Sequence, residues 1–472
     1  MQRIILLLII CNVFLCLKLK AQECNCSTNL DTLISDIENN YVGFNIKTKE
    51  EKAHDYKTLI KTLRAKSHNS DHYKCYLLLT EYANFFNDPH LKVLTTKLGP
   101  TNKYYDSLKI MFSKLAVEHI NLDSIINYYH EHDTNNTLEG IWSLPEFNYK
   151  IVIVKTNTAE RYKGIVIKAD NFKWYKGQVK MVLSGKNPYN IQFYIADHTQ
   201  RNAKALVENN TMNLGELGTW RKEQKGIQIN SDKEDIIYFK YLSSQTSLLR
   251  IGSCDIRLRD TINEIIGKNW KEITGRNNLI IDIRNNTGGS IMTLDTLIRL
   301  FYIKPILTDG LYIKSSKENI LLYTEALNNP EFNDKEKRNF QEVIDSLRAH
   351  LGEITLVSKP DSIVLNGTVN PKKIAIITNS RTGSAAELFT LYAKQSNKVI
   401  VVGEHTNGAL DYTELGRNRN LPCPMWQYIC PMGMSTHIYK PLIDNIGIIP
   451  DQKIPYNIDW IKWTQKYLEY DN

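Results

Sequence analysis

The chain has 472 residues, of which 42% are hydrophobic and 23% are charged, and its formal net charge is +8. This composition predicts a globular protein of two or three compact units, each long enough to bury its own core. The basic residues are spread along the chain without basic blocks or an interleaved aromatic motif, so a nucleic-acid partner is not expected.

The first 21 residues have the features of a signal peptide. Arg3 precedes an apolar run over residues 4–17, and Ala21 stands at a suitable cleavage position. The run is short for a membrane-spanning helix, and no later segment of about 18 apolar residues follows. Cys16 lacks the small residue expected before a lipid-modified cysteine, although lipid attachment stays open. We expect an exported protein, periplasmic or extracellular, with no integral membrane segment in the mature chain.

Removal of that segment leaves six cysteines, which an oxidising compartment allows to pair. They are Cys24, Cys26, Cys75, Cys254, Cys423 and Cys430. Cys423 and Cys430 flank "PMWQYI" and could close a hairpin-like loop, whereas Cys24 and Cys26 are too close in sequence to pair easily with each other. The spacings are not those of a zinc site, and His437 lacks the partners that would complete one, so no structural metal is expected.

Three regions with different hydrophobic patterns follow one another along the mature chain. Residues 22–135 show helical periodicity, as in "YKTLIKTLRAK", and predict an N-terminal helical domain. Residues 136–232 contain alternating segments such as "YKIVIVKT" and predict a β-rich domain, either a small antiparallel sheet or a barrel. Residues 233–472 alternate short apolar strands with helices, the pattern of a buried α/β sheet, with a charged helical insertion near 328–350. The predicted fold class is therefore α/β.

"NLIIDIRNNTGGSIMTLDTLIRLFY", residues 278–302, predicts a strand, a glycine turn and a helix. Gly288 and Gly289 allow a sharp turn and leave amide hydrogens near a helix N-terminus, a position that favours negative charge. Such amides suit an oxyanion, but glycines that only make turns are common. The window therefore leaves both interpretations open.

"NSRTGSAAELFTLYAKQ", residues 379–395, places a small polar loop between a strand and a helix. Ser384 and Glu387 fit an S-x-x-E capping box, in which both side chains satisfy free amides at the helix start. A serine at a helix start also has an exposed oxygen, and the helix dipole favours negative charge beside it. Ser384 is either a cap or a nucleophile.

The two windows, followed by "VIVVGEHTNGA" and the closing "IDNIGIIPD", occur in an order that resembles peptidase family S41, the C-terminal processing and tricorn-type serine peptidases. The resemblance covers residues 236–460. It implies a crotonase- or ClpP-like α/β catalytic core that needs no cofactor. It also implies that Ser384 is the nucleophile and that the amides of Ala385 and of Gly288 or Gly289 form the oxyanion hole.

The resemblance also bears on the general base. Processing peptidases place a lysine in a G-K-G stretch, but here Gly408 is followed by Ala409, so the Ser-Lys dyad is absent at that site. The tricorn-like branch uses a histidine in an Asp-Gly-His-Thr type of segment, which "FFNDPHLKV" resembles, and this makes His90 the implied base. An exposed loop histidine is the alternative reading of His90. His405, in the loop after the strand that follows the serine helix, is the competing base.

The orienting acid implied by the resemblance is Asp444, just before the closing Pro-Asp motif. The tricorn-like branch has a serine before its histidine, whereas Pro89 stands here, so that relay is not preserved intact. Asp411 and Glu404 are alternatives, and Asp444 also reads as a turn-capping aspartate.

These features predict an exported serine endopeptidase that acts on peptides or unfolded protein segments. One rival is a catalytically inactive binding or scaffold protein of the same fold, because the lysine is missing and the histidine relay is imperfect. Another is a hydratase or acyl-CoA enzyme, which would need a coenzyme pocket. Residues 140–230 lack the carboxylate-binding loop of a PDZ domain, so recognition of free C-termini is not assumed. Self-association is possible, since both branches of the family include assemblies.

Overall fold

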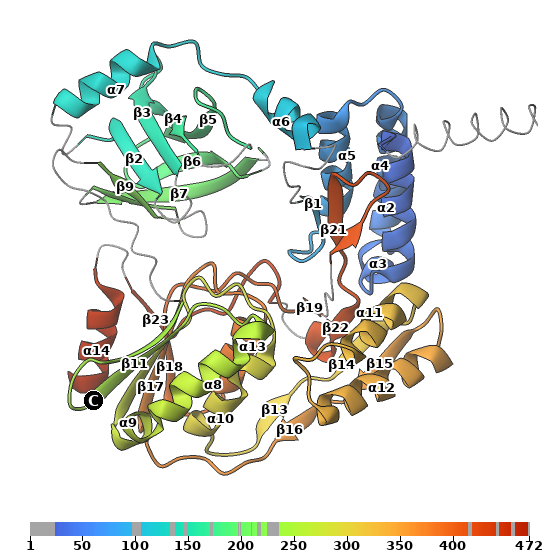
Figure 1. Ribbon diagram of the computed structural model, residues 1–472, viewed down its shortest axis with the longest axis vertical. Coiled ribbons are helices and arrows are strands. Elements are labelled where there is room, and N and C mark those ends of the chain that lie inside the picture. Colours follow the sequence, from blue (N-terminus) through green and yellow to red (C-terminus); the bar gives the residue numbers. More distant parts are fainter. Residues whose placement is uncertain are drawn as a thin grey trace, which may run out of the picture. The chain divides into compact units, whose positions relative to one another are not determined.

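The computed structural model describes most of the chain (Figure 1). The described residues are 24–96, 105–132, 137–144, 149–169, 173–196, 198, 200–208, 210–214, 219–223, 236–413, 418–439, 443–454 and 458–470. The predicted signal peptide, residues 1–21, lies outside them. Two compact units are present: unit 1 comprises Met1–Tyr105, Thr308–Asp361 and Ala409–Asn445, and unit 2 comprises Asp106–Leu307, Ser362–Gly408 and Ile446–Asn472.

Unit 2 contains a six-stranded sheet in the order β10-β11-β12-β17-β18-β23. All neighbours are parallel except β10, which is antiparallel to β11. The strands are β10 (Ile237–Tyr241), β11 (Thr246–Ile251), β12 (Asn278–Asp282), β17 (Lys373–Thr378), β18 (Val399–Gly403) and β23 (Gln452–Lys453). Every residue of β11 and β12 is buried, as expected for parallel strands covered on both faces.

Helices cover both faces of this sheet (Figure 1). Alternate strand residues, such as Ile281 and Ile376, pack with one group of helices, while their neighbours Ile280 and Ile377 pack with α14. The first group is α8 (Arg259–Lys268), α9 (Trp270–Gly275), α10 (Asp295–Phe301) and α13 (Ala385–Ala393), and α14 is Trp460–Tyr470; the short helices η3 (Ile256–Leu258) and η4 (Ile291–Leu294) precede α8 and α10. The predicted α/β fold class is confirmed.

The strand-rich middle region forms a closed antiparallel barrel, which decides between the sheet and the barrel left open by the sequence. Its interior holds large apolar side chains that include Trp142, Met181 and Trp220. The helix α7 (Leu122–Glu131) packs on its outside against Ile141 and Val152. The strands are β2 (Gly140–Leu144), β3 (Tyr149–Lys155), β4 (Arg161–Lys168), β5 (Val179–Ser184), β6 (Tyr189–Tyr194), β7 (Gln200–Glu208), β8 (Thr211–Asn213) and β9 (Thr219–Lys222); α6 (Tyr105–Ser113) precedes α7.

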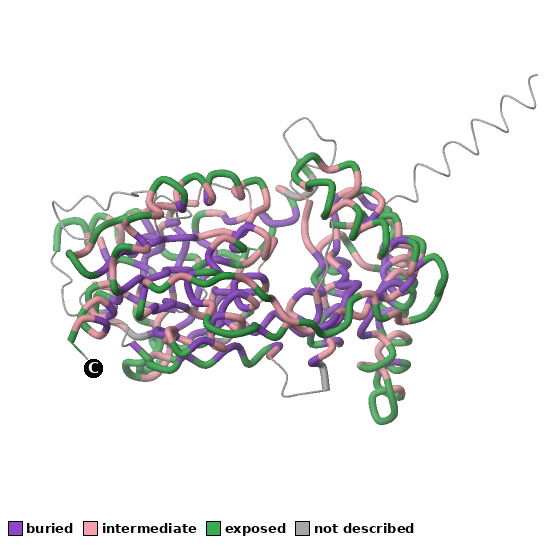
Figure 2. The backbone as a smooth tube through the Cα atoms, turned by 90° about the horizontal axis from the view of Figure 1, so that it is seen from below, coloured by how far each residue is buried: buried purple, intermediate pink, exposed green. Residues whose placement is uncertain are grey.

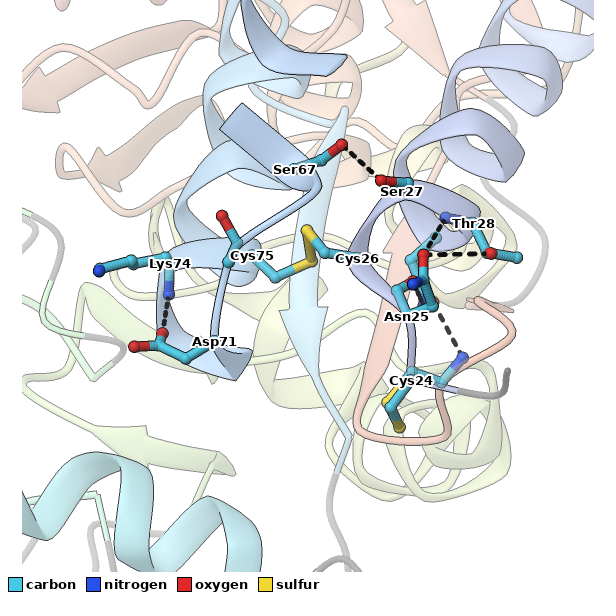
Figure 3. Close-up of a disulfide and its surroundings, with 12 residues drawn as sticks. Cys24, Asn25, Cys26, Ser27, Thr28, Ser67, Asp71, Lys74 and Cys75 are labelled. Atoms are coloured by element: carbon cyan, nitrogen blue, oxygen red, sulfur yellow. Dashed lines mark hydrogen bonds between the residues drawn. A yellow bond between two sulfur atoms is a disulfide. The ribbon is translucent and has the colours of Figure 1, made fainter. Parts of the chain in front are cut away.

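Unit 1 begins with helices that two disulfides tie down. Cys26 pairs with Cys75 and joins the start of α2 to α5, close to a Ser27–Ser67 hydrogen bond of 2.8 Å (Figure 3). Cys24 pairs with Cys423, so the suggested Cys423–Cys430 loop is wrong, and Cys430 is a buried free thiol. The elements are α2 (Cys26–Asn40), α3 (Phe44–Lys47), α4 (Glu51–Ser67), α5 (His72–Asn84) and β1 (Lys92–Thr95).

Two small sheets complete unit 1. β1 pairs with β21 in the order β1-β21-β20, and a second sheet has the order β15-β14-β22-β19. The charged segment near 328–350 is helical, as predicted, and packs with α11. The remaining elements are β13 (Ile306–Thr308), β14 (Leu311–Lys314), α11 (Lys317–Leu327), α12 (Asp334–Ala349), β15 (Ile354–Ser358), β16 (Asp361–Ile363), β19 (Tyr412–Thr413), β20 (Arg419–Asn420), β21 (Trp426–Ile429), β22 (Gly433–Ser435) and η5 (Thr436–Tyr439).

Burial follows this arrangement. In Figure 2 the buried stretches of the chain, in purple, lie mainly inside, and the exposed stretches, in green, lie mainly on the outside. None of the described helices combines the length and the apolar character needed to cross a bilayer.

Candidate active site

Ser384 occupies a strained turn between β17 and α13. Its backbone has φ 53° and ψ −121°, a conformation that residues other than glycine rarely adopt. Neighbouring hydrogen bonds hold the turn: the Gly383 amide donates to the Asn286 carbonyl (2.9 Å) and the Thr382 amide to the Asn379 carbonyl (2.8 Å). Strain of this kind costs about 1–3 kcal/mol and persists only where the surroundings impose it, which is common at active sites.

Ser384 and Glu387 form the capping box predicted from the sequence, but its two halves differ. The Ser384 amide donates to Glu387 Oε2 at 2.8 Å. The Ser384 hydroxyl makes no cap hydrogen bond of standard geometry among the described residues, and the Glu387 amide donates to the Ser384 carbonyl oxygen at 2.8 Å. The glutamate therefore secures the turn through a standard hydrogen bond, whereas the serine half of the capping box is present only as a weaker contact with the Glu387 amide.

Glu387 also does more than cap a helix. It is fully buried, and its Oε1 accepts hydrogen bonds from the Thr406 hydroxyl (2.5 Å) and the Gly408 amide (2.7 Å). One carboxylate thus joins the serine turn to the loop after β18, where the processing peptidases would place their lysine. The S-x-x-E pattern signalled this residue, but its spacing gave no sign of the contacts with Thr406 and Gly408.

The glycine turn after β12 lies against the serine. Gly288 has φ +97°, and a Cβ added there would stand 2.6 Å from Ser384 Cβ and 3.1 Å from the Ala385 nitrogen. Gly289 has φ +137°, and a Cβ there would stand 2.1 Å from the Cys254 carbonyl oxygen. Unit 2 therefore brings together all of the predicted residues of the nucleophile and the oxyanion hole.

The amides of this turn are not equivalent as oxyanion donors. The Gly288 amide donates to Asn286 Oδ1 at 3.0 Å, whereas the Gly289 amide has no partner among the described residues. The Ala385 amide is at the first position of α13 and has no intrahelical partner. Among the described residues, the amides of Ala385 and Gly289 are therefore available to donate, whereas that of Gly288 is engaged.

His90 belongs to unit 1, in the turn between α5 and β1. It is buried rather than an exposed loop histidine, with 8% of its surface accessible. Its ring hydrogen-bonds the main chain of Tyr412, and its Nδ1 has no partner among the described residues. Burial lowers the pKa of His90, opposed by the negative charge of Asp88 and reinforced by Lys92. A neutral imidazole with an unpaired ring nitrogen has the properties of a general base.

Asp88 was not among the residues predicted for the site. It is 7% exposed. Its Oδ1 accepts the His90 amide at 2.8 Å, the geometry of an Asx-turn, and its Oδ2 accepts the Tyr41 hydroxyl at 2.7 Å. The N-D-P segment before the histidine was the available signal, but the tyrosine lies 47 positions away.

Asp444 is also buried in unit 1. Its Oδ1 accepts the amides of Leu410 (2.6 Å) and Asp411 (2.7 Å), while its Oδ2 has no partner among the described residues. Burial raises the pKa of Asp444 to about 7, helped by the negative charges of Asp88 and Asp411 and opposed by the two amides. The predicted acid therefore has one oxygen fixed by the backbone and one unpaired.

The alternative acid Asp411 is engaged with His437. Its Oδ1 lies 2.7 Å from His437 Nε2, and its Oδ2 accepts the amides of Ile443 and Asp444, both at 2.9 Å. Asp309 Oδ2 lies 2.8 Å from the other ring nitrogen of His437. His437 therefore has two carboxylate partners, and no described cluster of His, Cys, Asp or Glu has the arrangement of a metal site.

The ionisation of this trio follows from its contacts. Burial would lower the pKa of His437, but hydrogen bonds with Asp411 and Asp309 outweigh it and raise the pKa. Burial would raise the pKa of Asp411, but His437 and the two amides lower it. Asp411, itself held by His437, therefore fixes the loop that carries Asp444 through the amides of Ile443 and Asp444.

The competing residues of the β18 loop belong to unit 2. His405 is exposed, and its Nδ1 lies 2.8 Å from the carbonyl oxygen of the adjacent Thr406. Burial raises the pKa of Glu404, opposed by a backbone hydrogen bond from Ser380. His405 therefore contacts its own loop, and Glu404 contacts the loop that carries Ser384.

Several solved structures are similar to this chain over almost its whole length. Mature CPAF is 13% identical (94% of this chain and 95% of that chain, TM-score 0.49). A mutant of CPAF is 12% identical (94% and 96%, TM-score 0.50), and the photosystem II D1 C-terminal processing protease is 12% identical (91% and 93%, TM-score 0.37). At this identity the similarity to the CPAF mutant indicates a shared fold. Residues 246–454 match the family model of peptidase family S41. This match covers less than half of the 472-residue chain, and it supports a serine peptidase of the S41 type.

Proposed function

We propose that this chain is an exported serine endopeptidase that cleaves peptides or unfolded protein segments. The observation that carries the proposal is the strained turn at Ser384, which places the serine at the start of α13 beside Gly288 with no cap hydrogen bond of standard geometry from its hydroxyl. A helix cap alone does not require a positive φ at the serine, because N-cap residues normally have extended backbone angles.

In the proposed mechanism the Ser384 hydroxyl attacks the scissile carbonyl carbon while His90 takes its proton. The amides of Ala385 and of Gly289 or Gly288 stabilise the tetrahedral oxyanion. His90 then gives the proton to the leaving amine, and water hydrolyses the acyl-enzyme by the same steps. Asp444 is the proposed orienting acid, acting on the imidazole directly or through another hydroxyl.

Export is supported by two independent features. The N-terminal 21 residues have the pattern of a signal peptide, and the structure contains two disulfides, which persist in oxidising compartments. Disulfide-bonded unit 1 also carries His90, so the base would depend on an oxidising environment.

The proposal is tested by the digestion of an unfolded protein such as reduced, alkylated casein with the mature chain. Ser384→Ala should abolish cleavage and His90→Gln should reduce it by at least 10³-fold. Ser380→Ala is the matched control, because Ser380 lies in the same loop and its buried hydroxyl has no described partner; it should retain activity. Cleavage that survives Ser384→Ala would overturn the proposal, and a folded chain that cuts nothing would support the scaffold protein.

A further inference from the structure

Asp88 is joined by hydrogen bonds to both the main chain of His90 and the side chain of Tyr41. Tyr41 is 1% exposed and directly follows α2, and burial raises its pKa well above the ordinary value, so it remains a hydrogen-bond donor at every physiological pH. Its 2.7 Å bond fixes one oxygen of Asp88, and the His90 amide fixes the other at 2.8 Å. The carboxylate therefore cannot rotate without breaking one of two buried hydrogen bonds.

The Asp88 carboxylate is therefore fixed against the backbone of the proposed base, because its Oδ1 accepts the His90 amide at 2.8 Å. An imidazole that accepts a proton in a buried site needs a nearby negative charge, because burial disfavours the charged ring. Among the influences on His90, Asp88 is the leading one that favours protonation, and Lys92 opposes it. Asp444 does not contribute to the shift at His90, and its raised pKa leaves its carboxyl partly protonated near pH 7.

We propose that Asp88 is a positioning residue of this peptidase: held by Tyr41, its carboxylate fixes the His90 turn and supplies the negative charge beside the imidazolium that forms when Ser384 gives up its proton. The proposal rests on the proposed function of His90 and deepens it. In this proposal Asp444 helps to orient the His90 ring, and the negative charge that stabilises the imidazolium comes mainly from Asp88.

Other charged and polar groups also surround His90 and Asp88. Lys92, in β1, acts on His90 through its positive charge, and the main chain of Tyr412, in β19, hydrogen-bonds the His90 ring. The negative charge of Asp88 also raises the pKa of four groups outside its own turn. These are Tyr41, Lys47 of α3, Cys430 and Asp444. Lys47 Nζ lies 4.4 Å from the centre of the Tyr412 ring and donates to the Asn87 carbonyl at 3.3 Å, so it is held beside the same turn.

The test is an NMR titration of the full mature chain labelled with [¹³Cε1]histidine, with the His90 signal assigned from its loss in His90→Gln. Asp88→Asn keeps an oxygen for the His90 amide but removes the charge. It should lower the pKa of His90 by about one unit, move the acid limb of kcat/KM by the same amount and lower kcat about tenfold with KM nearly unchanged.

Asp36→Asn is the matched control, because Asp36 accepts a 2.7 Å hydrogen bond from Tyr428 in the same unit, as Asp88 does from Tyr41. Asp36→Asn and Asp444→Asn should each shift His90 by less than Asp88→Asn does. An unchanged His90 titration in folded Asp88→Asn, or a larger shift in Asp444→Asn, would overturn the proposal. Because the titration needs no activity, a shift seen in an inactive protein would support the role of Asp88 in setting the charge of His90 while refuting the peptidase function.

Discussion

Gly288 lies so close to Ser384 that a single added methyl group at Gly288 would stand 2.6 Å from the serine Cβ. The same carbon would stand 2.8 Å from the Gly383 carbonyl oxygen. Both neighbours belong to the strained turn, and neither can move without shifting the start of α13. The contact joins two sequence windows that are nearly a hundred residues apart.

Gly288→Ala should therefore displace the serine turn. We expect the rate of casein cleavage to fall by about 10²–10³-fold, the cost of losing an oxyanion-hole contact. Gly352→Ala is the matched control, since Gly352 has a similar φ of +94° but an added Cβ would meet nothing within 4 Å. The control should lose about 1–2 kcal/mol of stability through its backbone and keep its activity. Equal activity of the two variants would show that the Gly288 contact is unimportant.

Glu387→Gln should uncouple the turn from the loop after β18. The side chain accepts from the Ser384 amide, the Gly408 amide and Thr406, so a glutamine NH₂ group would oppose one of these donors. We expect about 1–3 kcal/mol of destabilisation in urea unfolding, together with slower casein cleavage.

Glu469→Gln provides the comparison for this substitution. Glu469 accepts mainly from the hydroxyls of Ser243 and Thr246, which can reverse their roles and donate elsewhere. Its replacement should leave cleavage intact. If Glu387→Gln were as active and as stable as Glu469→Gln, the proposed tie between the serine turn and the 406–408 loop would be refuted.

His437→Ala should destabilise unit 1 by about 3–5 kcal/mol, because it leaves the buried carboxylate of Asp411 without its imidazole partner and also removes the contact with the half-buried Asp309. His350→Ala breaks an exposed pair with Glu353 and should cost at most about 1 kcal/mol. Thermal unfolding followed by circular dichroism measures both.

The penalty of His437→Ala should also depend on pH. The pKa of His437 is raised in the folded state, so its stabilisation is complete below its unfolded value of 6.5 and is lost as the pH rises through the folded value. The pKa of Asp411 is lowered, so its contribution is present above 3.8 and is lost as the pH falls through the folded value. The penalty should be largest near pH 5–6 and smaller at pH 9, and a penalty that grows with pH would contradict the assignment.

Asp444→Asn should change how stability depends on pH. A carboxyl whose folded pKa is raised from 3.8 to about 7 binds protons more tightly when folded, so the wild type loses stability as the pH rises from 4 to 7. Relative to the wild type, Asp444→Asn should gain on the order of 2–4 kcal/mol between pH 4 and pH 8. Asp345→Asn, at an exposed site on α12, should run parallel to the wild type. Parallel urea-unfolding curves for Asp444→Asn and the wild type would show that this carboxyl is not perturbed.

The sequence predicted those parts of the molecule that depend on local patterns. The buried strands, the S-x-x-E pair at Ser384 and the glycine turn at Gly288 each have a periodicity or spacing that fixes them locally. Closure of the barrel was not predictable, because it depends on β2 pairing with β9, which is distant in sequence.

Long-range partners were also out of reach. Cys423 pairs with Cys24, 399 positions away, rather than with nearby Cys430. His437 finds Asp309 at a separation of 128 residues, and Asp88 finds Tyr41 at 47. Pairings of this kind are set by packing of whole elements, and no single window of sequence contains them.

The central claim is that Ser384 is an activated nucleophile with His90 as its base. The most direct test is labelling of the purified mature chain with a fluorophosphonate probe, followed by peptide mapping of the adduct. We predict an adduct on Ser384 that is abolished by Ser384→Ala and strongly reduced by His90→Gln, and that persists in Ser380→Ala. An absence of labelling in the folded wild type, or labelling at a different residue, would contradict the claim and leave Ser384 as the N-cap of α13.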